Sequence, residues 1–232
     1  MPKNVKVTPL ERLKTLAKDE YNITPDNVRL MIADISYVFT QTLLQAKYSA
    51  REILRVTTKF RDAGRRSPPW QPASKKVPGR PQDGADGNRR LRWLFDPGHK
   101  FYAHENDATL TEVKYFLQAL SMDDAPELPA NSIQDCFLWL VGHRVMPGVY
   151  FDPIQLIPIS LSAVLHDART IQSGHLIPLD RGGHHEPKNA FLMLARSNQL
   201  QGNLTLDELL ALMQRILDRH KEAATLADRR PL

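Results

Sequence analysis

One histidine, two asparagines and a glycine pair near the C-terminus have the residue types needed to cleave a phosphodiester. Asn189 lies 14 positions after His175, Asn198 follows 9 positions later, and Gly182 and Gly183 lie inside the first interval. Phosphodiester hydrolysis needs a base that deprotonates water and a cation that offsets charge on the phosphate and the leaving oxygen. Imidazole suits the base because its unperturbed pKa lies near working pH. The amide oxygen of Asn198 is a hard, neutral ligand suited to Mg²⁺ or Mn²⁺.

The segment around these residues also resembles a known family. Residues 174–202 read GHLIPLDRGGHHEPKNAFLMLARSNQLQG, and the order H-x-x-P…G-G-x-H-x-x-x-N…N-x-x-Q-G resembles the HNH family of nucleases over about residues 170–210. The resemblance implies a ββα-metal finger, with a strand ending at the first His, a crossing loop, a second strand after the middle Asn, and a helix with the last ligand. It makes His175 the base and Asn198 the metal anchor. Asn189, the other residue of the catalytic set, would tie the loop together through backbone hydrogen bonds.

The chain departs from the family pattern in two ways that affect metals. Many HNH members have Asp directly before the catalytic His, but Gly174 stands there in this chain. Asp180 and His185 are further candidates for the metal, and His185 is otherwise a supporting residue with the glycine pair. Many members also have two Cys pairs that bind structural zinc, whereas this chain has one cysteine. We therefore expect no structural zinc and a finger held together by apolar packing.

Positive charge is concentrated in one stretch of the chain. The formal net charge is +5, but residues 51–102 contain thirteen Lys or Arg against five Asp or Glu, a net of +8 that leaves −3 for the remainder. This distribution is typical of a segment that faces phosphates. The candidate nucleic-acid contacts are Arg55, Lys59, Lys75, Lys76 and Arg80, with Arg181, Lys188, Arg196 and Gln201 around the motif.

Three helices are predicted at the N-terminus from their capping residues, Thr8, Thr24 and Ser49. The second, from Pro25 to about Gln45, has a long apolar face that could form a two-fold dimer contact or be buried within the chain. The third, from about Ala50 to Asp62, has a basic side that could contact DNA or simply face solvent. We therefore expect a helical region over residues 1–64.

A Pro- and Gly-rich basic linker or loop is expected over residues 65–92, as a tether or as a DNA contact. A C-terminal domain over residues 93–232 would contain the finger, so the predicted fold class is α+β, mostly helical. In this domain we expect helices from Thr109 to about Leu120, from Ser132 to about Gly142, and from Ser162 to Asp167. We also expect an irregular or edge strand over 149–159 and a strand over 170–177. A final helix from Thr205 to about His220 should cover the back of the finger.

These observations predict a metal-dependent DNA endonuclease, most consistent with a restriction or phage-defence role. The alternative is a degenerate, non-cleaving nucleic-acid-binding module with the same finger. No secretory leader and no apolar run near ~18 residues is visible, and a single cysteine fits a reducing compartment. We therefore expect a cytoplasmic protein with DNA as partner, no membrane association, and a homodimer if both strands are cut.

Overall fold

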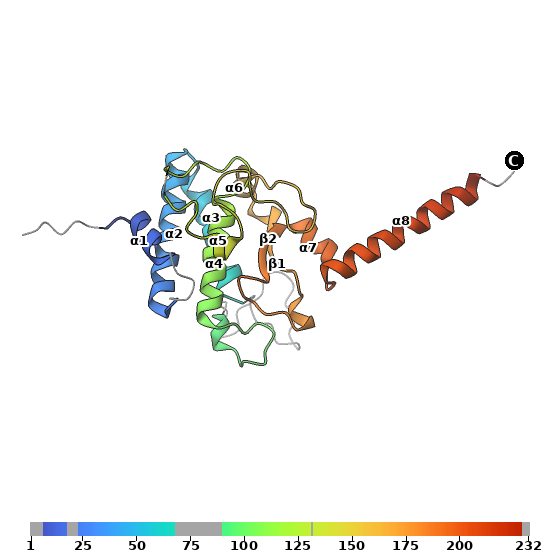
Figure 1. Ribbon diagram of the computed structural model, residues 1–232, viewed down its shortest axis with the longest axis horizontal. Helices are drawn as coiled ribbons and strands as arrows, with labels where there is room; N and C mark the ends of the chain where they lie inside the picture. Colours follow the sequence, from blue (N-terminus) through green and yellow to red (C-terminus); the bar gives the residue numbers. More distant parts are fainter. Residues whose placement is uncertain (1–6, 18–22, 68–89, 131, 229–232) are drawn as a thin grey trace, which may run out of the picture.

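The computed structural model describes residues 7–17, 23–67, 90–130 and 132–228. It combines α-helices with one two-stranded antiparallel sheet (Figure 1), so the fold mixes helix and sheet, as the α+β class requires. Within the described ranges, none of the helices is both long enough and apolar enough to cross a bilayer.

Three N-terminal helices begin where their caps predict: α1 (Pro9–Leu16), α2 (Pro25–Gln45) and α3 (Ala50–Gly64). Each cap side chain accepts a backbone N–H of the first turn, and α1 and α3 have full capping boxes, in which Glu11 and Glu52 bond back to the cap residue. These bonds join residues two or three positions apart, which is why the sequence predicted the helix starts correctly.

The core is organised around α4 (Glu105–Ala119), which packs against α2, α3 and the sheet. Phe116 of α4 makes edge-to-face contacts with Phe39 and Phe60, at ring-centroid distances of 5.2 and 5.3 Å. The apolar face of α2 is buried in this core through Val28, Met31, Ile32, Ile35, Val38, Phe39 and Leu43. Of the two alternatives for α2, the structure therefore shows burial within the chain and not a dimer contact.

Two predicted helix boundaries were wrong. Thr109 lies inside α4 and not at its cap, because its hydroxyl bonds back to the carbonyl of Glu105 at 2.7 Å, and the helix begins after His104. The helix expected from Ser132 is reduced to α5 (Leu138–Val141), since the residues before it form turns, with the backbone of Cys136 bonded to Ile133.

The middle of the chain is largely irregular around short elements. η2 (Arg92–Leu94) follows an isolated antiparallel bridge between Arg66 and Leu91. Residues 149–159 form no strand, only one bridge between Phe151 and Pro158. α6 (Leu161–His166), capped by Ser160, and η3 (Ala168–Thr170) then lead into the sheet.

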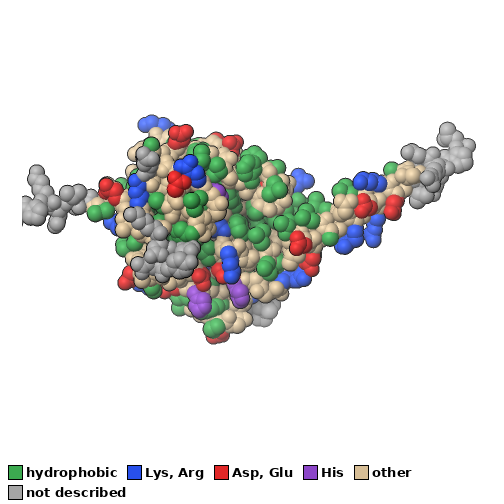
Figure 2. Space-filling model, viewed as in Figure 1, with side chains coloured by type: hydrophobic (Ala, Val, Ile, Leu, Met, Phe, Trp, Pro, Cys, Tyr) green, Lys and Arg blue, Asp and Glu red, His purple; other side chains and the backbone are tan. Residues whose placement is uncertain are grey.

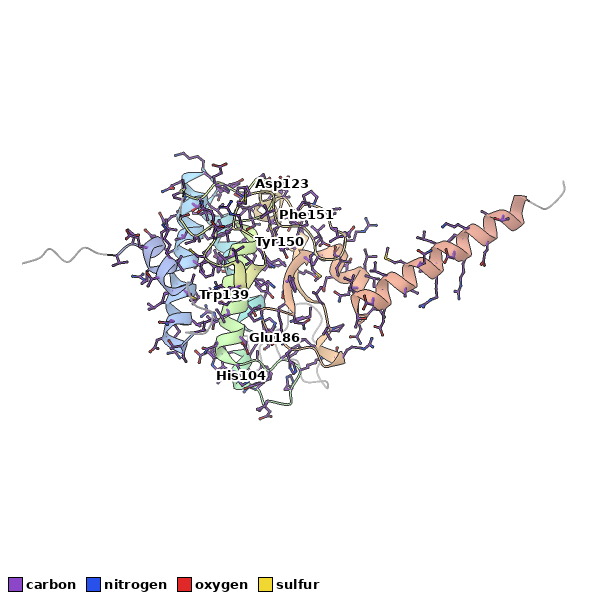
Figure 3. The ribbon with its side chains drawn as sticks, viewed as in Figure 1. His104, Asp123, Trp139, Tyr150, Phe151 and Glu186 are labelled. Carbon is purple, nitrogen blue, oxygen red and sulfur yellow. The ribbon has the colours of Figure 1, made fainter. Side chains whose placement is uncertain are left out.

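The predicted succession of strand, loop, strand and helix is present near the C-terminus. β1 (Ile171–His175) pairs antiparallel with β2 (Ala190–Leu194), η4 (Leu179–Arg181) lies in the loop between them, and α7 (Ala195–Gln201) follows. The register places His175 opposite Ala190. Tyr150, labelled in Figure 3, supports β2 by donating its buried hydroxyl to the carbonyl of Leu192.

The last helix, α8 (Leu206–Asp228), differs from expectation in length and position. It extends well past His220 and projects away from the body of the molecule (Figure 1). Leu209 is buried, but Leu210, Met213 and Leu217 are about half exposed, at 52%, 45% and 54%. The prediction that this helix covers the back of the finger was therefore wrong.

Candidate functional site

His175 lies at the end of β1 and is hydrogen-bonded to a second histidine from the following loop. Its Nε2 is 2.9 Å from Nδ1 of His185, and Nε2 of His185 is 2.7 Å from the carbonyl oxygen of Gly64. A carbonyl only accepts, so Nε2 of His185 must carry a proton. In neutral His185, Nδ1 is then an acceptor, and Nε2 of His175 must be the donor. Nδ1 of His175 is left with its lone pair, as a base requires.

Burial keeps both imidazoles neutral. Loss of solvation, and secondarily the charge of Arg92, lowers the pKa of His175 to about 4 and that of His185 well below its ordinary value. Arg92 is itself buried, and its guanidinium donates to the carbonyl oxygens of Gly64, Ala63 and Phe101. The end of α3 thus holds His185 and Arg92 through one shared carbonyl, and His185 in turn orients His175.

Asn189 ties the loop between β1 and β2 together. Its Oδ1 accepts the backbone N–H of Ile177 at 2.8 Å, while Nδ2 donates to the carbonyls of Ile177 and His184, both at 2.9 Å. These bonds match the loop-tying role that the resemblance implies. Asn189 is buried, and its side-chain bonds to described residues all go to the loop backbone, so it stabilises the loop that follows His175.

The same loop lies against α4. Lys114 of α4 donates its ammonium group to the carbonyl of Pro187, and its Nζ lies 3.3 Å from the centroid of the Phe191 ring. Figure 3 shows Glu186 of the loop and His104 at the same end of α4. Burial lowers the pKa of Lys114 to about 7. The rigid helix therefore fixes the loop that positions His185 and Asn189.

The two glycines of the loop serve different purposes. A positive φ was expected at both Gly182 and Gly183. Gly182 has φ +83°, the left-handed conformation that glycine tolerates best. Gly183 is not among the positive-φ residues; it is needed for close approach, because a Cβ there would stand 2.0 Å from the carbonyl oxygen of Ile177 and 2.9 Å from Nδ2 of Asn189.

Replacing Gly183 with alanine should therefore destabilise the protein, because the loop backbone must shift to admit the methyl group. We expect a loss of roughly 1–3 kcal/mol, or about 2–4 °C of Tm per kcal/mol for a chain of this size. Thermal unfolding followed by circular dichroism measures it. Gly98→Ala is the matched control, because nothing lies within 4 Å of a Cβ there. Equal Tm values for the two variants would contradict the close approach.

A positively charged cleft of about 1000 Å³ opens beside His175, between α3, η3 and β1. Basic side chains dominate its lining; they are Arg55, Lys59, Arg66, Arg92, His166 and Arg169, against Asp62 and Asp167. Arg55 and Lys59, predicted as nucleic-acid contacts, bond to the carbonyls of Leu165 and Ala168 on the opposite wall. Arg55 is exposed and Lys59 is half-buried, so both interpretations of the basic face of α3, a DNA contact and a solvent-facing surface, are compatible with this position.

Asn198 lies on α7, next to the position where many HNH members have Asp. Its Oδ1 is 2.9 Å from where a Cβ on Gly174 would stand, and its Nδ2 donates to Oε1 of Gln172 at 2.7 Å. Gln172 lines the cleft together with His175. Sδ and Cε of Met193, each 2.4 Å from that Cβ position, fill the space of a side chain at 174. Glycine is therefore required here while Met193 keeps this position.

The donor atoms near Asn198 fit a divalent cation only in part. Across the described ranges, no three His, Cys, Asp or Glu side chains gather into a metal-binding group. Asp180 forms an ion pair with Lys100 at 3.1 Å. Both ring nitrogens of His185 are already hydrogen-bonded, Nδ1 to His175 and Nε2 to the carbonyl of Gly64, and we call this chain of bonds the relay. Asn198 offers one hard amide oxygen, which suits Mg²⁺ or Mn²⁺, but further ligands would have to be water or substrate phosphate.

The remaining predicted contacts divide into structural and exposed residues. Gln201 is buried and donates to the carbonyls of His175 and Leu176 at 2.9 and 3.1 Å, so it anchors α7 to β1 and does not face phosphate. Arg181 makes a two-bond ion pair with Glu208, at 2.6 and 2.8 Å, which attaches the loop to α8. Lys188 and Arg196 are exposed. Lys75, Lys76 and Arg80 lie outside the described residues.

Sequence reasoning missed Arg92, Arg66, His166, Arg169 and Gln172 as parts of the cleft. Arg92 carried the clearest signal, since it stands in the apolar run LRWLF, where an arginine must find buried acceptors. For the other four no local pattern distinguishes them from ordinary surface residues. They become neighbours of His175 because α3 packs against both η3 and β1.

Comparisons with known proteins give limited information. No family model matches the chain, and no curated protein matches it significantly. Among solved structures, one described as a type II restriction endonuclease is similar, with 21% sequence identity and a TM-score of 0.45. That match covers 53% of this chain and 55% of the other chain, so each is matched over about half its length. A similarity of this extent assigns neither a family nor a function. A functional proposal must therefore be argued from the geometry of the site.

Proposed function

We propose that this protein is a metal-dependent DNA endonuclease of HNH type, with β1, β2 and α7 as its ββα-metal finger. The observation that supports it most is the relay from Gly64 through His185 to His175, which leaves Nδ1 of His175 as a base in a positively charged cleft. A neutral imidazole next to bound phosphate can accept a proton from water. The basic side chains of the cleft would hold the negatively charged backbone of the substrate.

In this mechanism Nδ1 of His175 removes a proton from a water molecule, whose oxygen attacks the phosphorus as the P–O bond to the leaving oxygen breaks. His185 holds the ring in the tautomer that this step needs. Asn198 would hold Mg²⁺ or Mn²⁺ together with substrate phosphate and water, and that cation would offset negative charge on the phosphate and the leaving oxygen. Arg92, fixed by three carbonyls, adds positive charge to the cleft wall.

Plasmid cleavage tests the proposal. Incubating the purified chain with supercoiled plasmid and Mg²⁺ or Mn²⁺ should produce nicked circles, and EDTA should prevent it. No nicking with any divalent cation, under conditions where the protein binds DNA, would overturn the proposal. Mapping the ends on modified and unmodified DNA would then test the restriction or phage-defence role.

A second candidate function is a non-cleaving nucleic-acid-binding module built on the same finger. The observation in its favour is the thioether of Met193 at the place where HNH members have an Asp ligand, with no carboxylate group gathered nearby among the described residues. The plasmid experiment separates the two, since this module would bind DNA without nicking it in any metal.

Phosphate binding in the cleft predicts a specific effect of Arg169. This side chain is 91% exposed at the cleft edge and pairs with Asp167. Replacing it with glutamine should weaken DNA binding at all sequences and reduce the log–log salt slope by about 0.9, the value for one lost phosphate contact. Arg144→Gln is the matched control, because Arg144 is also exposed and paired, with Asp135, but lies outside the cleft lining. Equal slopes for the two variants, measured by fluorescence anisotropy, would exclude Arg169 as a phosphate contact.

A further inference from the structure

The helix α8 has an apolar stripe that the body of the molecule leaves uncovered. At 100° per residue, Leu206, Leu210, Met213, Ile216 and Leu217 fall on one side of it. Met213 and Ile216 are each 45% exposed, and Leu210 and Leu217 just over half. Figure 2 shows apolar side chains along the part of α8 nearest the body. A continuous apolar stripe of this kind on a projecting helix indicates an interaction surface.

The chain itself offers no suitable cover. The longest segment outside the described residues, 68–89, has Trp70 and Val77 as its only large apolar residues apart from prolines. The shorter ones, 1–6, 18–22 and 229–232, read MPKNVK, KDEYN and RRPL. None of these sequences has apolar residues at a spacing that could match a stripe more than three turns long. We therefore consider a partner chain as the cover.

The charges on α8 favour a second copy of the same helix, running antiparallel. Asp207 and Lys221 lie on the same side of the stripe and have opposite charges. In an antiparallel pair, like flanks face each other, so Asp207 meets Lys221 of the second copy. The midpoint of this pairing is position 214, so the two-fold axis lies next to Met213. A parallel pair would instead bring the two acidic first turns together.

We propose that α8 is a dimerisation helix, which pairs antiparallel with α8 of a second copy around Met213. This contact is isologous and closed, as a two-fold dimer requires. The first turn of α8 is attached to the loop after β1 by the Arg181–Glu208 ion pair, and α8 follows directly after the helix of Asn198. Dimerisation would therefore fix the orientation of two candidate sites. Under the proposed function, such a dimer could cut both strands of a duplex.

Sedimentation equilibrium of the full chain without DNA or metal tests the dimer independently of cleavage. We expect a dimer at micromolar concentration and a monomer for Met213→Glu with Leu217→Glu. Ala211→Glu adds a negative charge on the polar face, opposite the stripe, and should remain dimeric. Circular dichroism should show equal helix content in the three proteins. A monomeric parent chain, or equal dissociation of the two variants, would overturn the proposal, as would binding of a monomeric parent to vesicles through the same stripe.

A charge exchange tests the antiparallel register. Asp207→Lys should raise the dimer dissociation constant several-fold, because it meets Lys221 of the second copy. Adding Lys221→Asp to the same chain should restore the parent value, since both pairs are then reversed. Glu208 is left unchanged because it already binds Arg181. A double variant that stays as weak as Asp207→Lys would overturn this arrangement.

Discussion

Replacing His175 with alanine should reduce DNA cleavage by roughly 10²–10⁴-fold, the usual contribution of a general base. DNA affinity should change little, but Tm should fall by a few degrees, because Nδ1 of the buried His185 loses its donor and a buried polar group left unpaired costs about 1–3 kcal/mol. The measurement is single-turnover nicking at saturating protein. His166→Ala is the matched control, since it removes another imidazole that lines the same cleft. Wild-type cleavage by His175→Ala would remove this residue from the base role.

Because the pKa of His175 is lowered, the pH dependence of kcat/KM and of stability should differ from that of an ordinary histidine. The free protein should keep the basic form of His175 down to a pH of about 4, so kcat/KM should stay level through pH 6.5, where an ordinary histidine would begin to protonate. Stability should behave differently. The unfolded chain takes up a proton near pH 6.5 and the folded chain only near 4, so this group's stabilisation is present above pH 6.5 and is lost as pH falls towards 4. The loss is roughly 3 kcal/mol at 1.4 kcal/mol per pKa unit.

Two outcomes would contradict this assignment. A kcat/KM that falls tenfold per pH unit from 6.5, in protein shown to be folded at each pH, would mean that His175 is solvated in the working enzyme. His185→Ala provides a second check, because it removes the acceptor for Nε2 of His175 and leaves the Gly64 carbonyl to Arg92 alone. That variant should lose much of the cleavage and some stability, since a buried polar group left unpaired costs about 1–3 kcal/mol.

The second large effect is expected at Asn198. Asn198→Ala should reduce cleavage by roughly 10²–10³-fold, because a bound cation contributes several kcal/mol and each 1.4 kcal/mol is a factor of ten. Asn198→Asp is the informative companion. It keeps an oxygen ligand and adds a negative charge, so the Mg²⁺ concentration for half-maximal nicking should fall.

Direct metal binding separates this role from a structural one. Asn198 also donates to Gln172, and Gln172→Ala removes that bond while leaving the amide oxygen of Asn198 in place. We expect Mn²⁺ titrated into the protein–DNA complex, followed by electron paramagnetic resonance, to bind Gln172→Ala like the parent and Asn198→Ala more weakly. Unchanged Mn²⁺ binding by Asn198→Ala would exclude it as the ligand.

Much of the local structure was predictable. The starts of α1, α2 and α3, and the succession from β1 through α7, follow from capping residues and from the spacing of the motif. Asn189 and Gly182 also have the roles their residue types indicate, the first as a loop tie and the second at positive φ. In each case the deciding contacts join residues a few positions apart or within one short loop, so residue type and spacing are enough to predict them.

The errors arose where local signals had more than one outcome. Thr109 was predicted to begin a helix, but in the structure it is buried within α4, as is Glu112, which is paired to Arg65. The apolar pattern of α8 was predicted to cover the finger, because a period of 3.6 residues shows that a stripe exists and not what lies against it. Gln201 was predicted to be a phosphate contact. Its amide nitrogen instead donates to three backbone carbonyls, those of His175, Leu176 and Leu204.

By itself, the sequence determined how the three N-terminal helices begin and the order of the motif: a histidine before a glycine-containing loop, an asparagine to close that loop, and a second asparagine on the next helix. The tertiary structure alone decided that Gly64, 121 positions before His185, sets the tautomer of His175, and that Arg92 and Arg169 line the same cleft. The physical reason is range. Caps and turns are fixed by bonds along a few residues, whereas the relay and the cleft depend on how α3 packs against β1, which is determined by the burial of the whole core.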